Sequence, residues 1–214
     1  MDESLLDTLA SVQRLALSYA PRAMRSDTLA LLALNARLAG IVRAGGEPVI
    51  AQMKFAWWRD MLARPKEDWP LGEPLLELLR MWRGDVTALG RLVDGWEGLL
   101  AEILGETEIA EFGEGHAAAW SALAEGQGNA VIRTAATQAA LGDLSLHLGD
   151  PAEKALVMTK LGAFGSANGS LPRTHRPLAV LRGLALRALR RGSSEILDGP
   201  GALAAAMRLG FTGR

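Results

Sequence analysis

Apolar residues recur at intervals of three and four along most of the chain, which is the spacing that places them on one face of an α-helix. Alanine and leucine dominate these segments and runs of β-branched residues are absent, so helix is favoured over strand. We therefore predict an all-α helical bundle that forms one domain over residues 1–214. The predicted helices span residues 3–20, 27–45, 48–64, 72–82, 86–105, 108–127, 129–142, 151–166, 177–191 and 200–209.

Many of the predicted helix ends coincide with residue types that favour such ends. Asp27 and Asp85 are candidate N-caps, because a carboxylate accepts hydrogen bonds from the free amides of a first turn. Prolines fall in the first turn of three predicted helices, where a missing N–H costs nothing: Pro48, Pro151 and Pro177. Glycines mark several predicted C-terminal ends: Gly45, Gly46, Gly84, Gly105, Gly149 and Gly192.

The predicted helix at residues 48–64 has apolar side chains on more than half of its circumference. One apolar stripe consists of Ile50, Met53, Trp57 and Met61, and a second, about 100° away, of Ala51, Phe55, Trp58 and Leu62. A helix of this kind is covered on two sides, so we predict that it is central and largely buried. The adjacent indoles of Trp57 and Trp58 are then two anchors of the core. The alternative is that one of them lines something other than the core.

Composition narrows the class of protein. Hydrophobic residues make up 49% of the chain and charged residues 22%, which is ordinary for a soluble globular protein. The absence of cysteine excludes disulfides and thiolate metal sites and fits a reducing compartment. The acidic start of the chain lacks the order of a signal peptide, and no apolar run approaches the roughly 20 residues of a spanning helix. We expect a cytoplasmic protein.

Charge is distributed unevenly although the net charge is only −1. Residues 151–214 hold ten Lys or Arg and three Asp or Glu, a net +7, which leaves −8 for the remainder. The simpler explanation is that the basic residues form the solvated side of helices that pack on the acidic part. The alternative is a peripheral contact with an anionic membrane surface. No aromatic residue interleaves the basic stretch at 173–191, so we expect no nucleic-acid partner.

The remaining side-chain chemistry predicts no catalytic or metal-binding residue. The three histidines, His116, His147 and His175, are scattered along the chain. Glu111, Glu114 and His116 lie close together, but their spacing does not match that of a helical zinc site, and we expect them on a helix surface. From residue chemistry alone, the chain is a helical domain without a predicted cofactor.

Two segments in the first third of the chain resemble the squalene/phytoene synthase family. The first, SYAPRAMRSDTLALLALNARLAGIV, places Arg25 and Arg37 at two arginine positions of the family. The second, GEPVIAQMKFAWWRDML, contains the W-W-R-D motif, here residues 57–60. Weaker likeness continues in the same order as far as the segment NGSLPRTHRPLAVLRGLALRAL. The family consists of enzymes that condense prenyl diphosphates head to head, and the resemblance implies the all-α isoprenoid-synthase fold.

The chain departs from the family at both of its Asp-rich motifs. In active members these motifs face each other across a helical cavity and hold Mg²⁺, which also binds the diphosphate of the substrate. The first should begin three residues after Arg37 as D-D-x-x-D, but the chain has Gly40, Ile41, Val42, Arg43 and Ala44 there. The second should precede the Leu171-Pro172 element, yet the sequence between Ala155 and Pro172 contains no acid.

Three hypotheses follow for function. The favoured one is a catalytically degenerate member, a pseudoenzyme. It would hold an apolar or isoprenoid ligand or a partner protein in the helical cavity where active members bind their substrate. The pairs Leu34, Asn35 and Trp57, Trp58 resemble those of family members that assist assembly of the respiratory NADH dehydrogenase. The alternative is an active prenyl transferase of terpenoid biosynthesis with displaced ligands, which would need Mg²⁺. The third is a basic helical module for anionic membrane surfaces.

The resemblance also implies a set of candidate binding residues that face the cavity, and it predicts no catalytic residue. The candidates are Arg25, Asn35, Arg37, Trp57, Trp58 and Arg59. Arg37 is the most informative of these, because an unpaired guanidinium in a low-dielectric cavity is costly. In one arrangement, Arg37 pairs with an acid of a neighbouring helix and the substrate cavity of the family is closed. In the other, Arg37 faces an open pocket and binds an anionic head group. We favour the closed arrangement.

Overall fold

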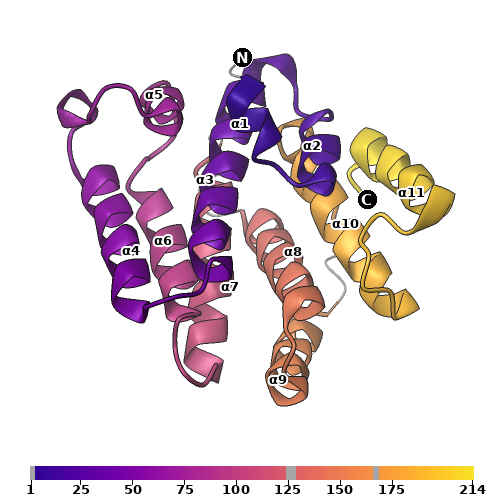
Figure 1. Ribbon diagram of the computed structural model, residues 1–214. Coiled ribbons are helices and arrows are strands. Elements are labelled where there is room, and N and C mark those ends of the chain that lie inside the picture. Colours follow the sequence, from indigo (N-terminus) through magenta and orange to yellow (C-terminus); the bar gives the residue numbers. More distant parts are fainter. Residues whose placement is uncertain (1–2, 124–128, 166–168) are drawn as a thin grey trace.

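The computed structural model describes residues 3–123, 129–165 and 169–214, and every regular element within these ranges is helical, which confirms the all-α prediction. The α-helices, labelled in Figure 1, are α1 (Glu3–Asp7), α2 (Ser11–Leu17), α3 (Arg25–Arg43), α4 (Pro48–Ala63), α5 (Pro74–Arg80), α6 (Ala88–Gly98), α7 (Glu106–Ser121), α8 (Ala130–His147), α9 (Pro151–Gly162), α10 (Arg176–Arg191) and α11 (Gly199–Thr212). Three short 3₁₀ turns lie between them: η1 (Arg22–Met24), η2 (Lys66–Asp68) and η3 (Arg173–His175).

The helices form a row with α3 laid over its middle. Helices α4, α6, α7, α8, α10 and α11 follow one another across the molecule, each packed on the next (Figure 1). Helix α3 packs on α5 and α6 and touches α1, α2 and α4. Surrounded in this way, α3 buries most of its circumference, including Leu29, Leu34 and Leu38. Helix α3 is therefore the central helix of the molecule. Across the described ranges, no helix has the length and hydropathy needed to cross a membrane.

The two predicted N-caps have other roles. Helix α3 begins at Arg25, directly after η1, so Asp27 lies inside its first turn. The Asp27 carboxylate is buried and accepts hydrogen bonds from Arg83 Nε and Nη2 at 2.8 and 2.6 Å. Asp85 accepts from Thr87 N at 2.9 Å in the turn before α6, which begins at Ala88. Both aspartates thus bind groups near a helix start without capping it.

Proline and glycine signals were more reliable. Pro48, Pro151 and Pro177 lie in the first turns of α4, α9 and α10, as predicted. Left-handed glycines follow the ends of two helices, as expected for C-terminal caps: Gly45 and Gly46 with φ of 62° and 93°, and Gly192 with φ of 64°. Gly105 is a correction, because it is the N-cap of α7.

Several helix boundaries differ from the predicted ones. The predicted helix at residues 3–20 is interrupted between α1 and α2, because Gln13 Oε1 accepts the hydrogen bond of Ala10 N at 3.0 Å and starts a new helix there. Helix α6 ends at Gly98, short of the predicted residue 105, whereas α8 continues past residue 142 to His147. Residues 124–127 and 166, predicted as helical, lie outside the described residues.

Helix α4 is not the central, largely buried helix that its two apolar stripes predicted. Trp58 is 3% exposed, but Trp57 is 39%, Ile50 51% and Met53 67% exposed. The physical reason is position: α4 lies at the edge of the row and packs on α6, so one of its two apolar faces has no neighbouring helix (Figure 1). Trp58 is a core anchor, and Trp57 is not.

Candidate functional site

Two cavities lie on opposite faces of α3. The outer cavity, of about 470 Å³, separates α3 from α4 and is lined by Thr8, Ala36, Arg37, Gly40, Ile41, Lys54, Trp57 and Trp58. The inner cavity, of about 670 Å³, lies between α3 and helices α6, α7, α8 and α10. Thr8 and Ala36 line both cavities, so the two border each other.

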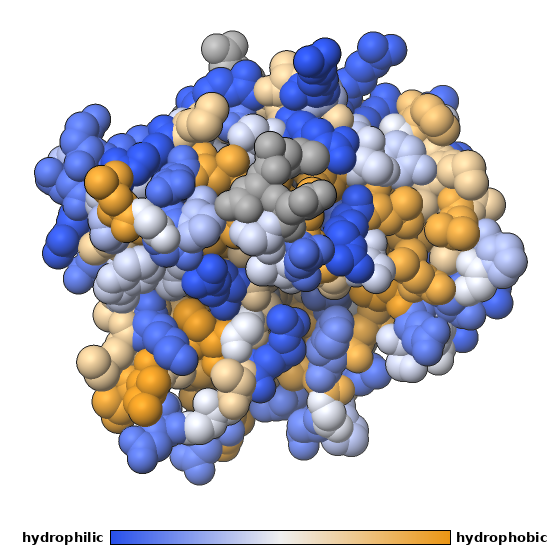
Figure 2. Space-filling view, turned by 45° about the horizontal axis from the view of Figure 1, so that its top comes forward, coloured by the Kyte–Doolittle hydropathy of each residue, from blue (hydrophilic) through white to orange (hydrophobic). Residues whose placement is uncertain are grey.

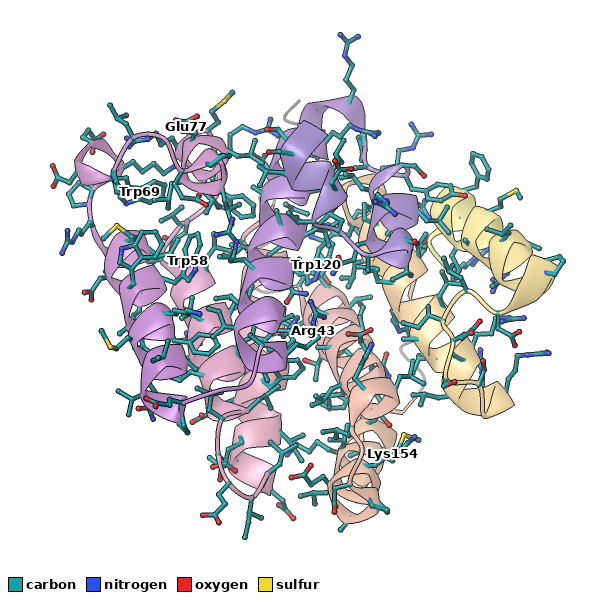
Figure 3. All side chains as sticks on the ribbon, in the orientation of Figure 1. Arg43, Trp58, Trp69, Glu77, Trp120 and Lys154 are labelled. Carbon is teal, nitrogen blue, oxygen red and sulfur yellow. The ribbon has the colours of Figure 1, made fainter. Side chains whose placement is uncertain are left out.

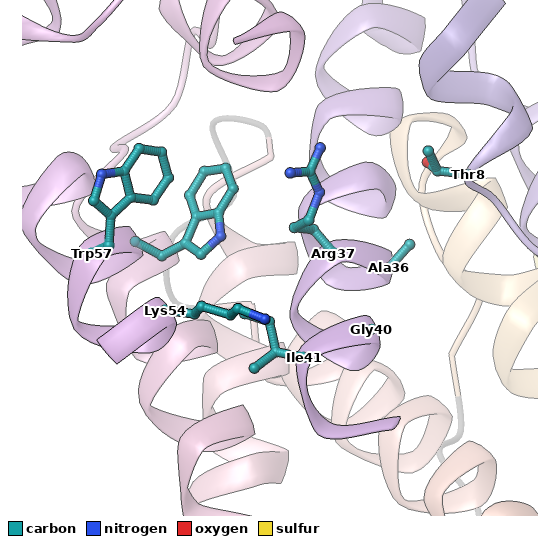
Figure 4. Close-up of a pocket in the computed structure, with 8 residues that line it drawn as sticks. Thr8, Ala36, Arg37, Gly40, Ile41, Lys54 and Trp57 are labelled. Atoms are coloured by element: carbon teal, nitrogen blue, oxygen red, sulfur yellow. The ribbon is translucent and has the colours of Figure 1, made fainter. Parts of the chain in front are cut away.

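The outer cavity contains two cationic side chains. Arg37 extends from α3 and Lys54 from α4 into the gap between these helices (Figure 4). Arg37 Nη2 lies 3.0 Å from Glu73 Oε1, while the other oxygen of Glu73 caps α5 by accepting from Leu76 N at 2.9 Å. The Arg37 side chain is nevertheless 44% exposed. Arg37 is therefore paired, as favoured, but the cavity beside it is open, so the expected closure is wrong.

The adjacent tryptophans line the outer cavity together. Their ring centroids are 4.9 Å apart and the rings meet edge to face at 81°. Because neighbouring residues on a helix point about 100° apart, the indole of Trp58 enters the core while that of Trp57 remains partly exposed. Near the middle of the α3 wall, Gly40 has no atom within 4 Å of the position a Cβ would take, so this part of the cavity is unfilled.

The inner cavity is mostly apolar and has a buried polar group in its wall. Trp96 Nε1 donates to Asn35 Oδ1 at 2.9 Å, and His116 Nε2 lies 2.9 Å from the same oxygen. His116 Nδ1 lies 2.9 Å from Phe112 O. Burial lowers the pKa of His116 to about 4, so the ring is neutral and has one N–H for two acceptors. One of its two contacts therefore lacks a proton.

Charged side chains also line the inner cavity. Arg43 from α3 and Asp143 and His147 from α8 are among them, and Figure 3 shows Arg43 and Trp120 near the middle of the molecule, in the region between α3 and α8. The Asp143 side chain lines this cavity and is 52% exposed, while its carboxylate lies close to neighbouring helices. Burial of the carboxylate raises the pKa of Asp143, and the charges of His147 and Arg43 oppose the rise. The cavity thus combines apolar walls with a few polar groups, the usual form of a small-molecule site.

Comparison with known proteins supports the family resemblance in the first half of the chain. Residues 13–101 match the family model described as squalene/phytoene synthase. Over these 89 of the 214 residues, the chain is similar to the squalene/phytoene synthase family. The matched range contains the two predicted arginine positions and the W-W-R-D motif. No curated protein and no solved structure matches the chain.

Residues 40–44, where the resemblance leads us to expect the first Asp-rich motif, lie on the wall between the cavities. Of residues 40–44, Gly40 and Ile41 line the outer cavity, and Val42 and Arg43 line the inner one. None of the four is a carboxylate, and one is a cation. Within the part of the chain that the structure describes, no group of three or more His, Asp or Glu side chains is arranged to hold a metal ion.

The six predicted site residues do not share one face. Arg37, Trp57 and Trp58 line the outer cavity, whereas Asn35 lines the inner one, because Asn35 and Arg37 are about 200° apart around α3. Arg59 donates to Asp94 at 2.7 Å and to Glu97, which ties α4 to α6 and raises the pKa of Arg59. Arg59 and Arg25, the first residue of α3, line neither cavity.

Sequence reasoning missed most of the inner cavity. His116 was expected on a helix surface, but it is only 8% exposed. Its neighbours in sequence misled the interpretation, since Glu111 and Glu114 occupy the outer side of the same helix. The bond between His116 and Asn35 joins residues 81 positions apart. One signal was available in the sequence: seven of the ten residues preceding Ser121 are Gly, Ala, Phe or Trp, which is not typical of a surface helix, and eight of the ten are buried.

Proposed function

We propose that this chain is a non-catalytic member of the squalene/phytoene synthase family that binds an apolar ligand in the inner cavity. The observation that carries the proposal is the wall of α3: where active members present carboxylates, this wall presents Gly40, Ile41, Val42 and Arg43 to two open cavities. A volume of about 670 Å³ lies within the range of roughly 300–1,000 Å³ that small-molecule sites occupy.

The residues present do not fit the Mg²⁺ ions of active family members. Mg²⁺ takes oxygen ligands, commonly one or two carboxylates together with the phosphates of the substrate. On the α3 wall the only charged group facing the inner cavity from residues 40–44 is the guanidinium of Arg43, which repels a divalent cation. Three carboxylates line the rest of the cavity, Asp143, Glu153 and Glu195, but none lies on the α3 wall and they do not form a group arranged to hold a metal ion. This donor set argues against metal-assisted loss of diphosphate.

The polar group in the inner cavity indicates what kind of ligand fits. Asn35, Trp96 and His116 are uncharged, and apolar side chains from four helices surround them. Such a wall suits an isoprenoid or similar apolar chain with a neutral hydroxyl or carbonyl group. Holding this ligand, or an apolar partner helix, during assembly of the respiratory NADH dehydrogenase is the biological role that the resemblance at Asn35 and Trp57 suggests.

Two measurements test the proposal. The purified chain is incubated with radiolabelled farnesyl or geranylgeranyl diphosphate and Mg²⁺, and we expect neither a condensed product nor diphosphate release. Farnesol, the neutral analogue, is titrated while tryptophan fluorescence is recorded, because Trp96 and Trp120 line the inner cavity. We expect saturable binding to the wild type. Formation of squalene or phytoene would establish the transferase alternative and overturn the proposal.

A pair of variants locates the binding. Ala139 lines the inner cavity and Ala56 is exposed on α4, so Ala139→Phe fills the cavity while Ala56→Phe makes the same change on the surface. We expect at least a tenfold loss of farnesol affinity for Ala139→Phe and no change for Ala56→Phe. Equal affinity in both variants would place the ligand elsewhere.

A further inference from the structure

Helix α11 presents an apolar stripe to the outside of the molecule. Its inner face is buried against α2 and α10 through Ala202, Ala206 and Leu209. Its outer face carries Leu203, Met207 and Phe211 at intervals of four residues, which are 48%, 53% and 77% exposed. Three large apolar side chains in a row on one helical face are more than the scattered exposure expected of a soluble surface.

Contacts with Tyr19 and with residues 170 and 171 hold α11 in place on the body of the protein. The Tyr19 ring lies directly on Gly210, where an added Cβ would be 2.1 Å from it, and the rings of Tyr19 and Phe211 meet edge to face at 6.0 Å. At the end of the helix, Ser170 Oγ donates to Thr212 O at 2.8 Å and Leu171 N donates to Gly213 O at 3.2 Å. Helix α11 is therefore fixed to the body of the protein and presents its outer face as a formed surface.

The charged side chains of α11 and of the residues after it are all basic, and the N-cap residue Asp198 is paired with Arg191. Residues 199–214 contain Arg208 and Arg214 and no acid, and the wider segment at 151–214 has a net charge of +7. Arg208 and Arg214 are both exposed. The exposed apolar stripe of α4 differs in this respect, because Lys54 and Asp60 of opposite charge flank it. In Figure 2, hydrophobic side chains gather on the side of the molecule where α11 lies.

We propose that the outer face of α11 docks onto an anionic membrane surface. Leu203, Met207 and Phe211 enter the boundary between head groups and acyl chains, and Arg208 and Arg214 meet the anionic head groups. An amphipathic helix binds in the interface in this way when apolar burial and attraction to anionic lipid act together. The inference is independent of what the inner cavity binds.

A membrane fits this face better than a second copy of the chain does. A symmetric dimer would place the same patch on both partners, and the arginines of one copy would then face those of the other. Like charges brought together across an interface oppose association. An anionic lipid surface instead supplies the opposite charge along the whole stripe.

The test is binding to vesicles of defined composition, measured by co-sedimentation. We expect the wild-type chain to bind vesicles of phosphatidylcholine with 30% phosphatidylglycerol at least tenfold more tightly than vesicles of phosphatidylcholine alone, and to be released by 0.5 M salt. Met207→Glu should weaken binding at least tenfold, and Arg208→Glu should weaken it on the anionic vesicles only. Met53→Glu is the matched control, because Met53 is 67% exposed on α4 and should leave binding unchanged.

Several outcomes would overturn the inference. Wild-type protein that does not sediment with anionic vesicles excludes the membrane, and equal loss in Met207→Glu and Met53→Glu excludes α11 as the docking face. A change in oligomeric state in Met207→Glu, measured by analytical ultracentrifugation without loss of vesicle binding, would show that a second copy covers this face. Circular dichroism of each variant excludes loss of folding as the cause.

Discussion

Two adjacent tryptophans show how different the roles of neighbouring residues can be. Trp58 is 3% exposed and fills the space between α4 and the core, whereas Trp57 is 39% exposed and forms part of the outer-cavity wall. Their edge-to-face contact at 4.9 Å couples the two roles, since Trp57 rests on the ring that Trp58 anchors.

Replacing each tryptophan by alanine should therefore have unequal effects on stability. Trp58→Ala should lower the free energy of unfolding by about 3–5 kcal/mol, the usual cost of removing a large buried side chain. Trp57→Ala should cost roughly 1 kcal/mol or less, because much of its surface is already in water. Denaturant unfolding monitored by circular dichroism measures both. Equal losses would mean that the exposed face of α4 is covered in solution.

His116 should make stability depend on pH. Its pKa is about 6.5 in the unfolded chain and about 4 in the folded one, because burial disfavours the charged ring. As the pH falls from 6.5 to 4, the unfolded state therefore takes up a proton that the folded state does not, and stability decreases by up to about 3 kcal/mol from this residue. Burial lowers the pKa of His175 as well, which acts in the same direction, whereas the raised pKa of Asp143 acts in the opposite direction.

The variant His116→Gln isolates this contribution. The free energy of unfolding of His116→Gln, measured by urea titration at several pH values, should fall less steeply between pH 6.5 and 4 than that of the wild type. His147→Asn measures the separate contribution of the His147–Asp143 pair, because the His147 side chain is 61% exposed and lies 3.8 Å from Asp143. A wild-type slope that His116→Gln leaves unchanged would contradict a neutral, buried imidazole.

At the scale of elements, α3 is tied to its surroundings by ion pairs at both ends. Near its start, the buried Asp27 accepts from Arg83. Further along, Arg37 reaches Glu73, which also caps α5. These two pairs join α3 to the segment between α4 and α6, which otherwise contacts the core through apolar side chains that include Trp69, Trp82 and the leucines of α5.

Arg37→Leu should have a small effect on stability and none on the inner cavity. The pair with Glu73 is half exposed, so its loss should cost at most about 1 kcal/mol. Farnesol affinity should be unchanged, because Arg37 faces the outer cavity. Thermal unfolding and the fluorescence titration measure the two effects, with Arg64→Leu as a control on the exposed end of α4. Loss of farnesol binding would show that the two cavities act as one site.

The sequence predicted where the helices lie better than it predicted which helices pack against each other. Spacing and proline signals located α4, α9 and α10 closely, because helix formation depends on local pattern. The break after α1 was missed, since it depends on one side-chain contact between Gln13 and Ala10. Burial of α4 was overestimated because periodicity shows which faces are apolar and not which of them another helix covers. The pairing of Asn35 with His116 needed the tertiary structure, since the residues lie on different helices.

At the scale of the whole molecule, the family match covers only part of the inner cavity. The match at residues 13–101 includes α3, α4 and α6, whereas α7, α8 and α10 complete the inner cavity from outside it. The wall opposite α3 is therefore built from residues that the family model does not describe. If the inner cavity binds a ligand, the choice of ligand depends in part on this wall, which includes His116 and Asp143.

Gly40, in the last turn of α3, lowers the stability of the helix. A glycine inside a helix is less stable there than an alanine by about 0.5–1 kcal/mol, and no neighbouring atom prevents Gly40 from carrying a methyl group. Gly40→Ala should therefore raise the thermal midpoint of unfolding, as scanning calorimetry would show, while making the outer cavity shallower. A midpoint that falls would mean that the cavity is narrower in solution. Residues 40–44 on the wall of α3 thus contain no carboxylate, but the space beside Gly40 is open, so a single codon change at position 40 could introduce an acid without a clash at its Cβ.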